Sequence, residues 1–259
     1  MGTSSSQRSP STPEWERVRE LYRQPDPDPN QVLSRIVRAL DPPTRAGMSD
    51  AAVVCCLDHL LDGAVVAATG DLSTLYTDPK LVEQAAAVGL AAGLRESAES
   101  DIVARVIASR FGDLALDALG TTVLDAAESL AGITSILQVT YPSLQSHFAG
   151  FHNESRLHDL SGSFLSHDFD HVFRYFVARD ISDFVGTDAL PTVSSSAMLQ
   201  DRIAHTCRSI TRGIDISDSE DLIRQALGQT DASLRSQMLQ RVFGRAANIG
   251  LRALTDAGE

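Results

Sequence analysis

The chain has 259 residues, 43% of them hydrophobic, and its 34 acidic residues outnumber 22 basic ones to give a formal net charge of −12. This length and composition predict a sizeable core, in one large domain or in two small helical ones. Because so acidic a chain repels phosphate backbones, nonspecific nucleic-acid binding is excluded unless the arginines cluster.

Cysteine usage and the lack of targeting signals predict a cytoplasmic protein. The chain has an odd number of cysteines, namely Cys55, Cys56 and Cys207. The adjacent residues Cys55 and Cys56 cannot form a relaxed disulfide with each other. Free cysteines in a helical core fit a reducing compartment. We find no apolar run of the roughly 18 residues that a membrane span needs, nor a signal peptide. Lys80 is the one lysine among 22 basic residues, which indicates a GC-rich bacterial genome.

The N-terminal segment changes character at Thr12. Residues 1–12 carry almost no apolar side chains, so burial cannot offset their ordering entropy and they are predicted to be disordered. Thr12, Pro13 and Glu14 then supply an N-cap, a proline at the first helical position and an acid in the first turn. The helix that follows has one apolar face, formed by Trp15, Val18, Leu21 and Tyr22.

Residues 25–29 alternate proline and aspartate. Each proline disfavours the α conformation of the residue before it, so this segment is predicted to be a stiff, extended linker. Asn30 is the expected cap of the next helix, which the prolines after Asp41 end.

From Ser49 to about Gln138 the chain is rich in Ala and Leu and predicts a series of helices joined by short loops, as in an antiparallel bundle. Glycines are expected to mark stops or turns between these helices, at Gly63, Gly70 and Gly120. The expected helix starts are Ser49-Asp50, Asp78-Pro79, Ser100-Asp101 and Thr121-Thr122.

The composition changes at Tyr141, because most of the Phe and His residues lie between Tyr141 and Phe184. A polar break over residues 186–196 precedes two or three C-terminal helices, the last over about residues 232–254. The sequence therefore predicts an all-α, multi-helix bundle. We expect a disordered tail (1–12), an N-terminal helical region (13–140) and an aromatic, His-rich and C-terminal region (141–259), the last two forming one continuous helical domain.

The segment His167-Asp168-Phe169-Asp170-His171 is the one candidate for self-contained chemistry. It resembles the metalloprotease spacing in which two histidines one helical turn apart bind zinc and an acid serves as base. Further ligands could come from just upstream, from His152, Glu154, His158 and Asp159. A metal-dependent hydrolase is therefore one hypothesis.

Helical geometry favours a different interpretation of the same segment. At about 100° per residue, His167 and His171 lie opposite an apolar stripe that begins at Phe169, and Arg174 shares their side. A fixed cation beside the ligands disfavours a catalytic zinc. We therefore expect a polar solvent or partner face, with Ser166 as N-cap and Asp168 beside the positive end of the helix dipole.

Other catalytic signatures are missing from the sequence. It contains no Gly-rich dinucleotide fingerprint, no phosphate-binding P-loop and no Gly-x-Ser-x-Gly elbow. We therefore assign no catalytic residue, no metal ligand and no cofactor, and expect a protein that is not an enzyme.

The tail offers a reactive group of its own. Removal of the initiator Met1 leaves Gly2 with a free α-amine, whose pKa near ~8 and lack of a side chain make it an accessible nucleophile for acylation. Gly2 and Ser6 also match a myristoylation pattern, which the bacterial composition disfavours.

Met1-Gly2-Thr3-Ser4, followed by a Ser- and Pro-rich tail, resembles the start of the QatB-like proteins of bacterial anti-phage defence systems. Those proteins are encoded beside a QueC-like enzyme, a relative of the 7-cyano-7-deazaguanine synthase. The resemblance implies that a QueC-like partner recognises Thr3 and Ser4 and joins a deazaguanine group to the amine of Gly2. The Gly-rich stretch expected after such a tail is absent from this sequence.

A helical scaffold or homo-oligomer is the remaining hypothesis. The aromatic segment after Tyr141 or the C-terminal helix would be the associating surface. Modification of the tail and association of the body are compatible, since a modified tail needs a body that positions it. We therefore expect protein partners from a defence system, and neither nucleic acid nor membrane as a partner.

Overall fold

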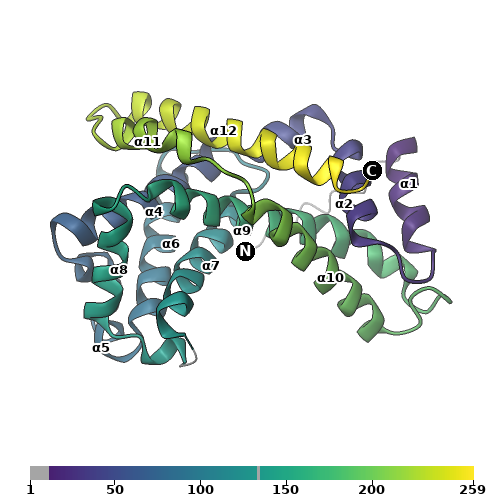
Figure 1. Ribbon diagram of the computed structural model, residues 1–259, viewed down its shortest axis with the longest axis horizontal. Helices are drawn as coiled ribbons and strands as arrows, with labels where there is room; N and C mark the ends of the chain where they lie inside the picture. The colour runs from purple at the N-terminus through teal and green to yellow at the C-terminus, as the bar shows by residue number, and fades with distance from the viewer. Residues whose placement is uncertain (1–11, 133–134) are drawn as a thin grey trace.

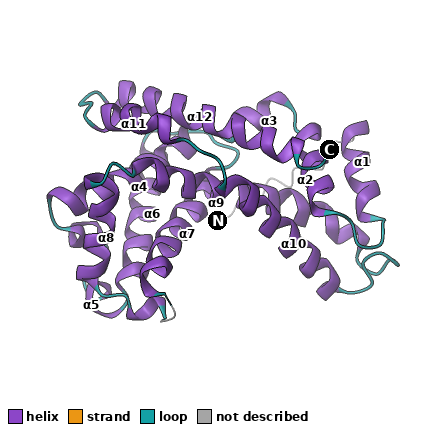
Figure 2. Cartoon of the chain, in the orientation of Figure 1, coloured by secondary structure: helices purple, strands orange, loops and turns teal. Residues whose placement is uncertain are grey.

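The computed structural model describes residues 12–132 and 135–259. Within these ranges the chain is built from helices, and its one β-type pairing is an isolated bridge between Val185 and Leu190. The predicted all-α, multi-helix fold is confirmed (Figure 2). Of the tail expected to be disordered, residues 1–12, all but Thr12 lie outside the described residues, and Thr12 caps the first helix.

The first two helices follow the sequence signals closely. Helix α1 (Pro13–Tyr22) begins where the Thr12 side chain accepts a hydrogen bond from the backbone N–H of Trp15, at 3.3 Å. All four residues of its predicted apolar face are buried. Helix α2 (Pro29–Ala39) is capped by Asp28, one residue before the proline at its first position, and the expected cap at Asn30 is wrong.

The linker before α2 turns instead of remaining extended. Asp26 adopts a φ of 53°, in the left-handed region, although Pro27 follows it. Aspartate is one of the few residues other than glycine that enter this region readily, because its short side chain bonds locally. The turn lays α1 back along α2, and these two helices pack together.

In the middle of the chain the helices are longer than predicted, because glycines expected to end them lie inside them. Asp50 caps helix α4, as expected, but Gly63 lies inside α4, and Gly120 and the expected starts at Ser100 and Thr121 also lie inside helices. A Cβ atom at Gly63 would lie 3.3 Å from the side chain of Leu94, so this glycine serves the close packing of α4 on α6. The elements of this part are α3 (Pro42–Gly47), α4 (Ala51–Thr69), η1 (Leu72–Leu75), α5 (Leu81–Gln84), α6 (Ala86–Ala104), α7 (Gly112–Ala131), η2 (Ile136–Gln138) and α8 (Tyr141–Asn153).

A long helix, α9 (Leu157–Ile181), runs through the centre of the molecule (Figure 1). Helices α4, α6, α7 and α8 stand together on one side of it, while α1, α2 and α10 lie on the other, and α11 and α12 cross the top. The last helix covers the predicted segment and extends it by two residues. The elements after α9 are η3 (Ser182–Phe184), α10 (Val193–Arg212), η4 (Ser217–Ser219), α11 (Glu220–Leu227) and α12 (Ala232–Asp256).

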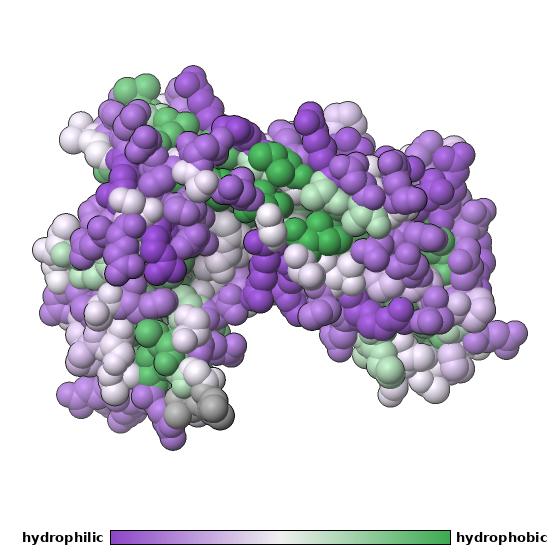
Figure 3. Space-filling view, in the orientation of Figure 1, coloured by the Kyte–Doolittle hydropathy of each residue, from purple (hydrophilic) through white to green (hydrophobic). Residues whose placement is uncertain are grey.

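Helices from both predicted regions share one hydrophobic core. It extends from Trp15 to Leu254, and it joins α4 to α8 and α2 to both α10 and α12. The packing therefore does not divide at residue 140. The face in Figure 3 is mainly hydrophilic, with apolar side chains gathered near the middle of the molecule.

One segment, Pro42–Thr69, is apolar and long enough to cross a membrane by composition, so the expectation that no such run exists is wrong. Of its most apolar window, 61% is buried inside the protein. Such burial is typical of a central helix in a globular core. In this fold α4 fills that place, since it packs against α6, α7, α8 and α12.

Candidate functional site

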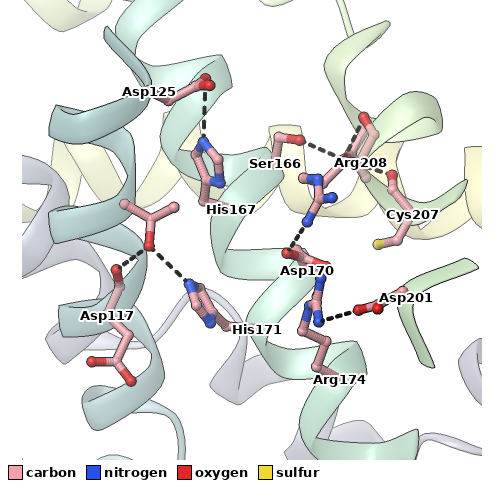
Figure 4. A network of polar contacts seen from close by, with 12 residues as sticks. Asp117, Asp125, Ser166, His167, Asp170, His171, Arg174, Asp201, Cys207 and Arg208 are labelled. Carbon is pink, nitrogen blue, oxygen red and sulfur yellow. Dashed lines mark hydrogen bonds and ion pairs between the residues drawn. The ribbon is translucent and has the colours of Figure 1, made fainter. Parts of the chain in front are cut away.

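The polar segment His167–His171 lies in the middle of α9 and is covered by neighbouring helices (Figure 4). The predicted polar face open to solvent or to a partner is therefore wrong: His167 is only 4% exposed and His171 is half-buried. Helix α7 packs along the side that carries both histidines, and α10 packs against another side. The predicted apolar stripe beginning at Phe169 is buried as well, so α9 is enclosed on several faces.

The expected helix start at Ser166 is also wrong, because α9 begins nine residues earlier, at Leu157. The Ser166 hydroxyl lies 2.9 Å from the Thr211 hydroxyl on α10, in a fully buried hydrogen bond. Ser166 therefore joins two helices instead of capping one.

Each histidine contacts its own residue on α7. The Nε2 atom of His167 lies 3.3 Å from Oδ2 of Asp125, and Arg212 from α10 lies 3.0 Å from the same oxygen. These two neighbours hold the pKa of the Asp125 carboxyl below its usual range, with the His167 contact the larger cause. The group ties α7, α9 and α10 together.

His171 occupies a different position one turn along the helix. Its Nε2 atom lies 3.2 Å from the hydroxyl oxygen of Thr121, and that hydroxyl donates its own hydrogen to the backbone carbonyl of Asp117 at 2.8 Å. The Thr121 oxygen can then only accept, so Nε2 of His171 must carry the hydrogen. Burial lowers the pKa of His171, which favours this neutral form.

Asp170 connects α9 to α10 through two arginines. It accepts hydrogen bonds from Nε of Arg174 at 3.1 Å and from Nη1 of Arg208 at 2.5 Å. Its side chain is 6% exposed, so both charge-assisted bonds compensate for the burial of the carboxylate. Arg174, the cation predicted to share the side of the histidines, is therefore paired with Asp170. Its Nη1 atom also lies 3.3 Å from Oδ1 of Asp201.

Asp168 makes no polar contact in this network. It is fully buried, and neither carboxyl oxygen has a hydrogen-bond partner among the described residues. Both ring nitrogens of His167 also lack a hydrogen bond there, although Nε2 approaches Asp125. Burial raises the pKa of Asp168 well above its usual value, and the negative charge of Asp50 at the start of α4 raises it further. The expected role beside a helix N-terminus is wrong, because Asp168 lies in the middle of α9.

The residues proposed as further metal ligands are held elsewhere. His158 lies at the start of α9, with Nδ1 2.9 Å from Glu220 and Nε2 3.2 Å from Asp159. Since the imidazoles of His167 and His171 also have separate partners, no contact favours a metal between them within the described parts of the chain. The metal-dependent hydrolase stays a prediction without a structural observation in its favour.

All three cysteines are buried and free. Burial raises the pKa of the Cys55 thiol to about 11 and that of the Cys56 and Cys207 thiols further. A thiol that keeps its proton at neutral pH is a poor nucleophile. None of the three is therefore activated in the folded protein.

One cluster was not anticipated by the sequence analysis. Cys55 and His59 on α4 meet Asp101 on α6, and one ligand atom from each side chain lies within 4.8 Å of the other two. The spacing of Cys55 and His59, one helical turn apart, was visible in the sequence. Asp101 was not, since 42 positions separate it from His59 and only packing brings them together.

The tail residues Gly2, Thr3 and Ser4 lie outside the described residues, so their proposed roles stay predictions. Comparison with models of protein families, with curated proteins and with solved structures found no match for this chain. The fold and the site thus define an all-α protein with a buried polar network in its central helix.

Proposed function

We propose that this protein is a non-enzymatic component of a bacterial anti-phage defence system, and that a QueC-like partner enzyme joins a deazaguanine group to the α-amine of Gly2. The resemblance of Met1-Gly2-Thr3-Ser4 to QatB-like proteins supports the proposal. In this proposal Thr3 and Ser4 are the positions that the partner recognises.

The structural observation that supports it is the attachment of the tail to the body. Thr12 caps α1, and Trp15 in the first turn of α1 is buried against α9. Pro13 and Glu14 beside the cap are exposed, so the chain leaves the body at its surface. A tail that precedes such an anchor in the chain can reach a partner without disturbing the core.

The distance available to the tail suits this role. Gly2 lies ten positions before Thr12, and a chain of that length spans at most about 35 Å when fully extended. A partner enzyme can therefore receive the Gly2 amine in its pocket while docking on the outside of the helical body.

The chemistry of the described side chains also agrees with a tail amine as the reactive group. The three thiols are buried with raised pKa values, whereas an α-amine with a pKa near ~8 is partly deprotonated at neutral pH. The proposal places the protein in the cytoplasm, where free cysteines persist.

Coexpression with a QueC-like enzyme from the same gene neighbourhood tests the proposal by intact-mass spectrometry. We expect a mass increase that peptide sequencing places on Gly2, and loss of that increase in Gly2→Ala, whose added methyl group crowds the amine. Ser9→Ala in the same tail is the matched control and should be modified normally. An unmodified wild-type chain, or full phage protection by Gly2→Ala, would contradict the proposal.

The partner-binding role of the body is tested separately by light scattering. We expect a complex of the full chain with the products of its neighbouring genes. A chain that stays monomeric in their presence would count against a body that positions the tail.

A further inference from the structure

The unanticipated cluster lies between two packed helices of the core. Cys55 and His59 are one turn apart on the same side of α4, and Asp101 faces them from the last turn of α6. The Nε2 atom of His59 lies 3.3 Å from Oδ2 of Asp101. A sulfur, an imidazole nitrogen and a carboxylate oxygen thus lie within 4.8 Å of one another, although α4 supplies two of them and α6 the third.

These distances fit one ion bound by all three atoms. Zinc takes nitrogen and oxygen ligands at about 2.0 Å and thiolate sulfur at about 2.3 Å, in a tetrahedral arrangement. Two ligand atoms of such a site lie about 3.3 Å apart when they are N and O, and about 3.5 Å apart when one is S. The His59–Asp101 separation of 3.3 Å matches the first value, and the limit of 4.8 Å on the other pairs requires only small side-chain rotations.

Burial of the three residues defines what completes the site. Cys55 is buried, whereas the side chains of His59 and Asp101 are 20% and 36% exposed. The cluster therefore has a closed sulfur side and a side that water reaches. Three protein ligands and one position open to water make up the coordination that zinc adopts in open sites.

From this geometry we propose that Cys55, His59 and Asp101 form a zinc-binding site that links α4 to α6, with water as the fourth ligand. On binding, the S–H bond of Cys55 breaks, a sulfur–zinc bond forms and the proton passes to bulk water. The thiolate and the Asp101 carboxylate then neutralise the two positive charges of the ion, so the site carries no net charge.

The same three residue types could instead form a nucleophilic thiol with a histidine and an acid. The structure disfavours that assignment. The pKa of the Cys55 thiol is raised to about 11, first by burial and then by the negative charge of Asp101, with Arg105 lowering it and Asp58 adding a smaller increase. A metal ion overcomes this cost because it bonds directly to the thiolate.

Arg105 is the competitor for this site. Its Nη2 atom lies 2.6 Å from Oδ2 of Asp101, the same oxygen that faces His59. The Arg105 side chain is 46% exposed at the end of α6, so it can turn into solvent when the ion binds. Removal of this guanidinium should therefore strengthen metal binding.

Cobalt(II) is the probe for the site, because a thiolate ligand gives tetrahedral cobalt a charge-transfer absorption band that oxygen and nitrogen ligands do not give. The full chain, purified without a His-tag and stripped with chelator, should bind one cobalt per chain with this band, and zinc should displace it. Zinc should also raise the melting temperature of the wild type.

Variants separate this site from adventitious binding. Cys55→Ser and His59→Gln should each lose the charge-transfer band or weaken zinc binding at least about tenfold, with circular dichroism reporting whether the fold is kept. Cys207→Ala, which removes a buried thiol on α10, is the matched control and should bind like the wild type. Arg105→Ala should bind zinc more tightly.

Two results would overturn the proposal. One is a wild-type chain that binds less than stoichiometric cobalt or shows no charge-transfer band. The other is His59→Gln or Cys55→Ser retaining wild-type affinity and spectrum. Neither result bears on modification of Gly2, so this inference and the proposed function can fail independently.

Discussion

The indole N–H of Trp15 in the first turn of α1 donates a hydrogen bond to the carboxylate of Asp180, 165 positions later near the end of α9. Both side chains are almost completely buried. The Arg179 guanidinium lies 5.0 Å from the centroid of the Trp15 ring. The same ring packs edge to face against Phe176, with ring centroids 5.8 Å apart. These contacts hold α1 against α9, and they therefore fix the position at which the tail joins the helical body.

Trp15→Phe tests how much the hydrogen bond contributes. Phe keeps most of the apolar contact with Phe176 but removes the donor from a buried carboxylate, so the free energy of unfolding should fall by about 1–3 kcal/mol. Urea unfolding measures this change. It is followed by circular dichroism because Trp15 is the single tryptophan, so the variant has no tryptophan fluorescence. Met198→Ala, at a residue 67% exposed, should change the free energy by less than about 0.5 kcal/mol. Equal stability of wild type and Trp15→Phe would contradict the role assigned to this bond.

Two glycines in helix interiors should respond oppositely to the same substitution. A Cβ atom at Gly93 on α6 would lie 1.8 Å from the backbone oxygen of Leu75, so Gly93→Ala must push α6 and η1 apart. We expect a loss of about 1–3 kcal/mol or more. A Cβ atom at Gly120 on α7 meets nothing within 4 Å, so Gly120→Ala should gain about 0.5–1 kcal/mol from helix propensity. The melting temperatures of both variants measure these changes. A higher melting temperature for Gly93→Ala would contradict the close packing of α6 on η1.

Asp168 should make the protein less stable as pH rises. Its pKa is raised in the folded state by burial first and by Asp50 second, so the folded chain keeps a proton that the unfolded chain has lost above about pH 4. Between that pH and the folded pKa, this group should lower the free energy of unfolding by up to about 1.4 kcal/mol per pH unit.

Asp168→Asn, which has a similar shape and cannot ionise, is the variant for this test. Urea unfolding at pH 5 and pH 8 should show a smaller decrease for Asp168→Asn than for the wild type, with the variant gaining relative stability at pH 8. Asp183→Asn, at an exposed position next to α9, should keep the wild-type dependence. The assigned neutral state would be wrong if the wild type and Asp168→Asn had the same pH dependence.

The thiols should be inert in the folded protein. Cys56 and Cys207 are fully buried and Cys55 is 7% exposed, and all three have raised pKa values. An aromatic disulfide reagent at pH 7.5 should therefore react slowly with the native chain and rapidly with all three thiols in denaturant. Rapid release of one equivalent from native protein would reveal an activated cysteine and would contradict this burial.

The sequence was sufficient for features that depend on neighbours along the chain. Thr12 and Pro13 identify the start of α1 because capping is a local interaction, and the apolar face beginning at Trp15 is buried as its spacing predicts. The long C-terminal helix α12 was found in the same way. These elements have one buried face, so their periodicity is simple.

Helix α9 shows why the rest required the tertiary structure. Its strong apolar stripe suggested that the opposite side, with His167 and His171, meets solvent. That inference assumes a single packed face, whereas α7 and α10 enclose the polar side and supply Asp125, Thr121 and Arg208 as partners. No periodicity in one helix reveals which residues a distant helix brings to it.

The same limit explains the glycines and the candidate metal site. Gly63 looks like a helix stop in sequence, but it lies inside α4 because the side chain of Leu94 on α6 approaches it closely. The spacing of Cys55 and His59 is a local property, while the third ligand at Asp101 depends on how α4 packs against α6. Local interactions thus determined where many helices begin and which class of fold they form, and the packing of distant helices decided which polar groups are buried, paired or brought together.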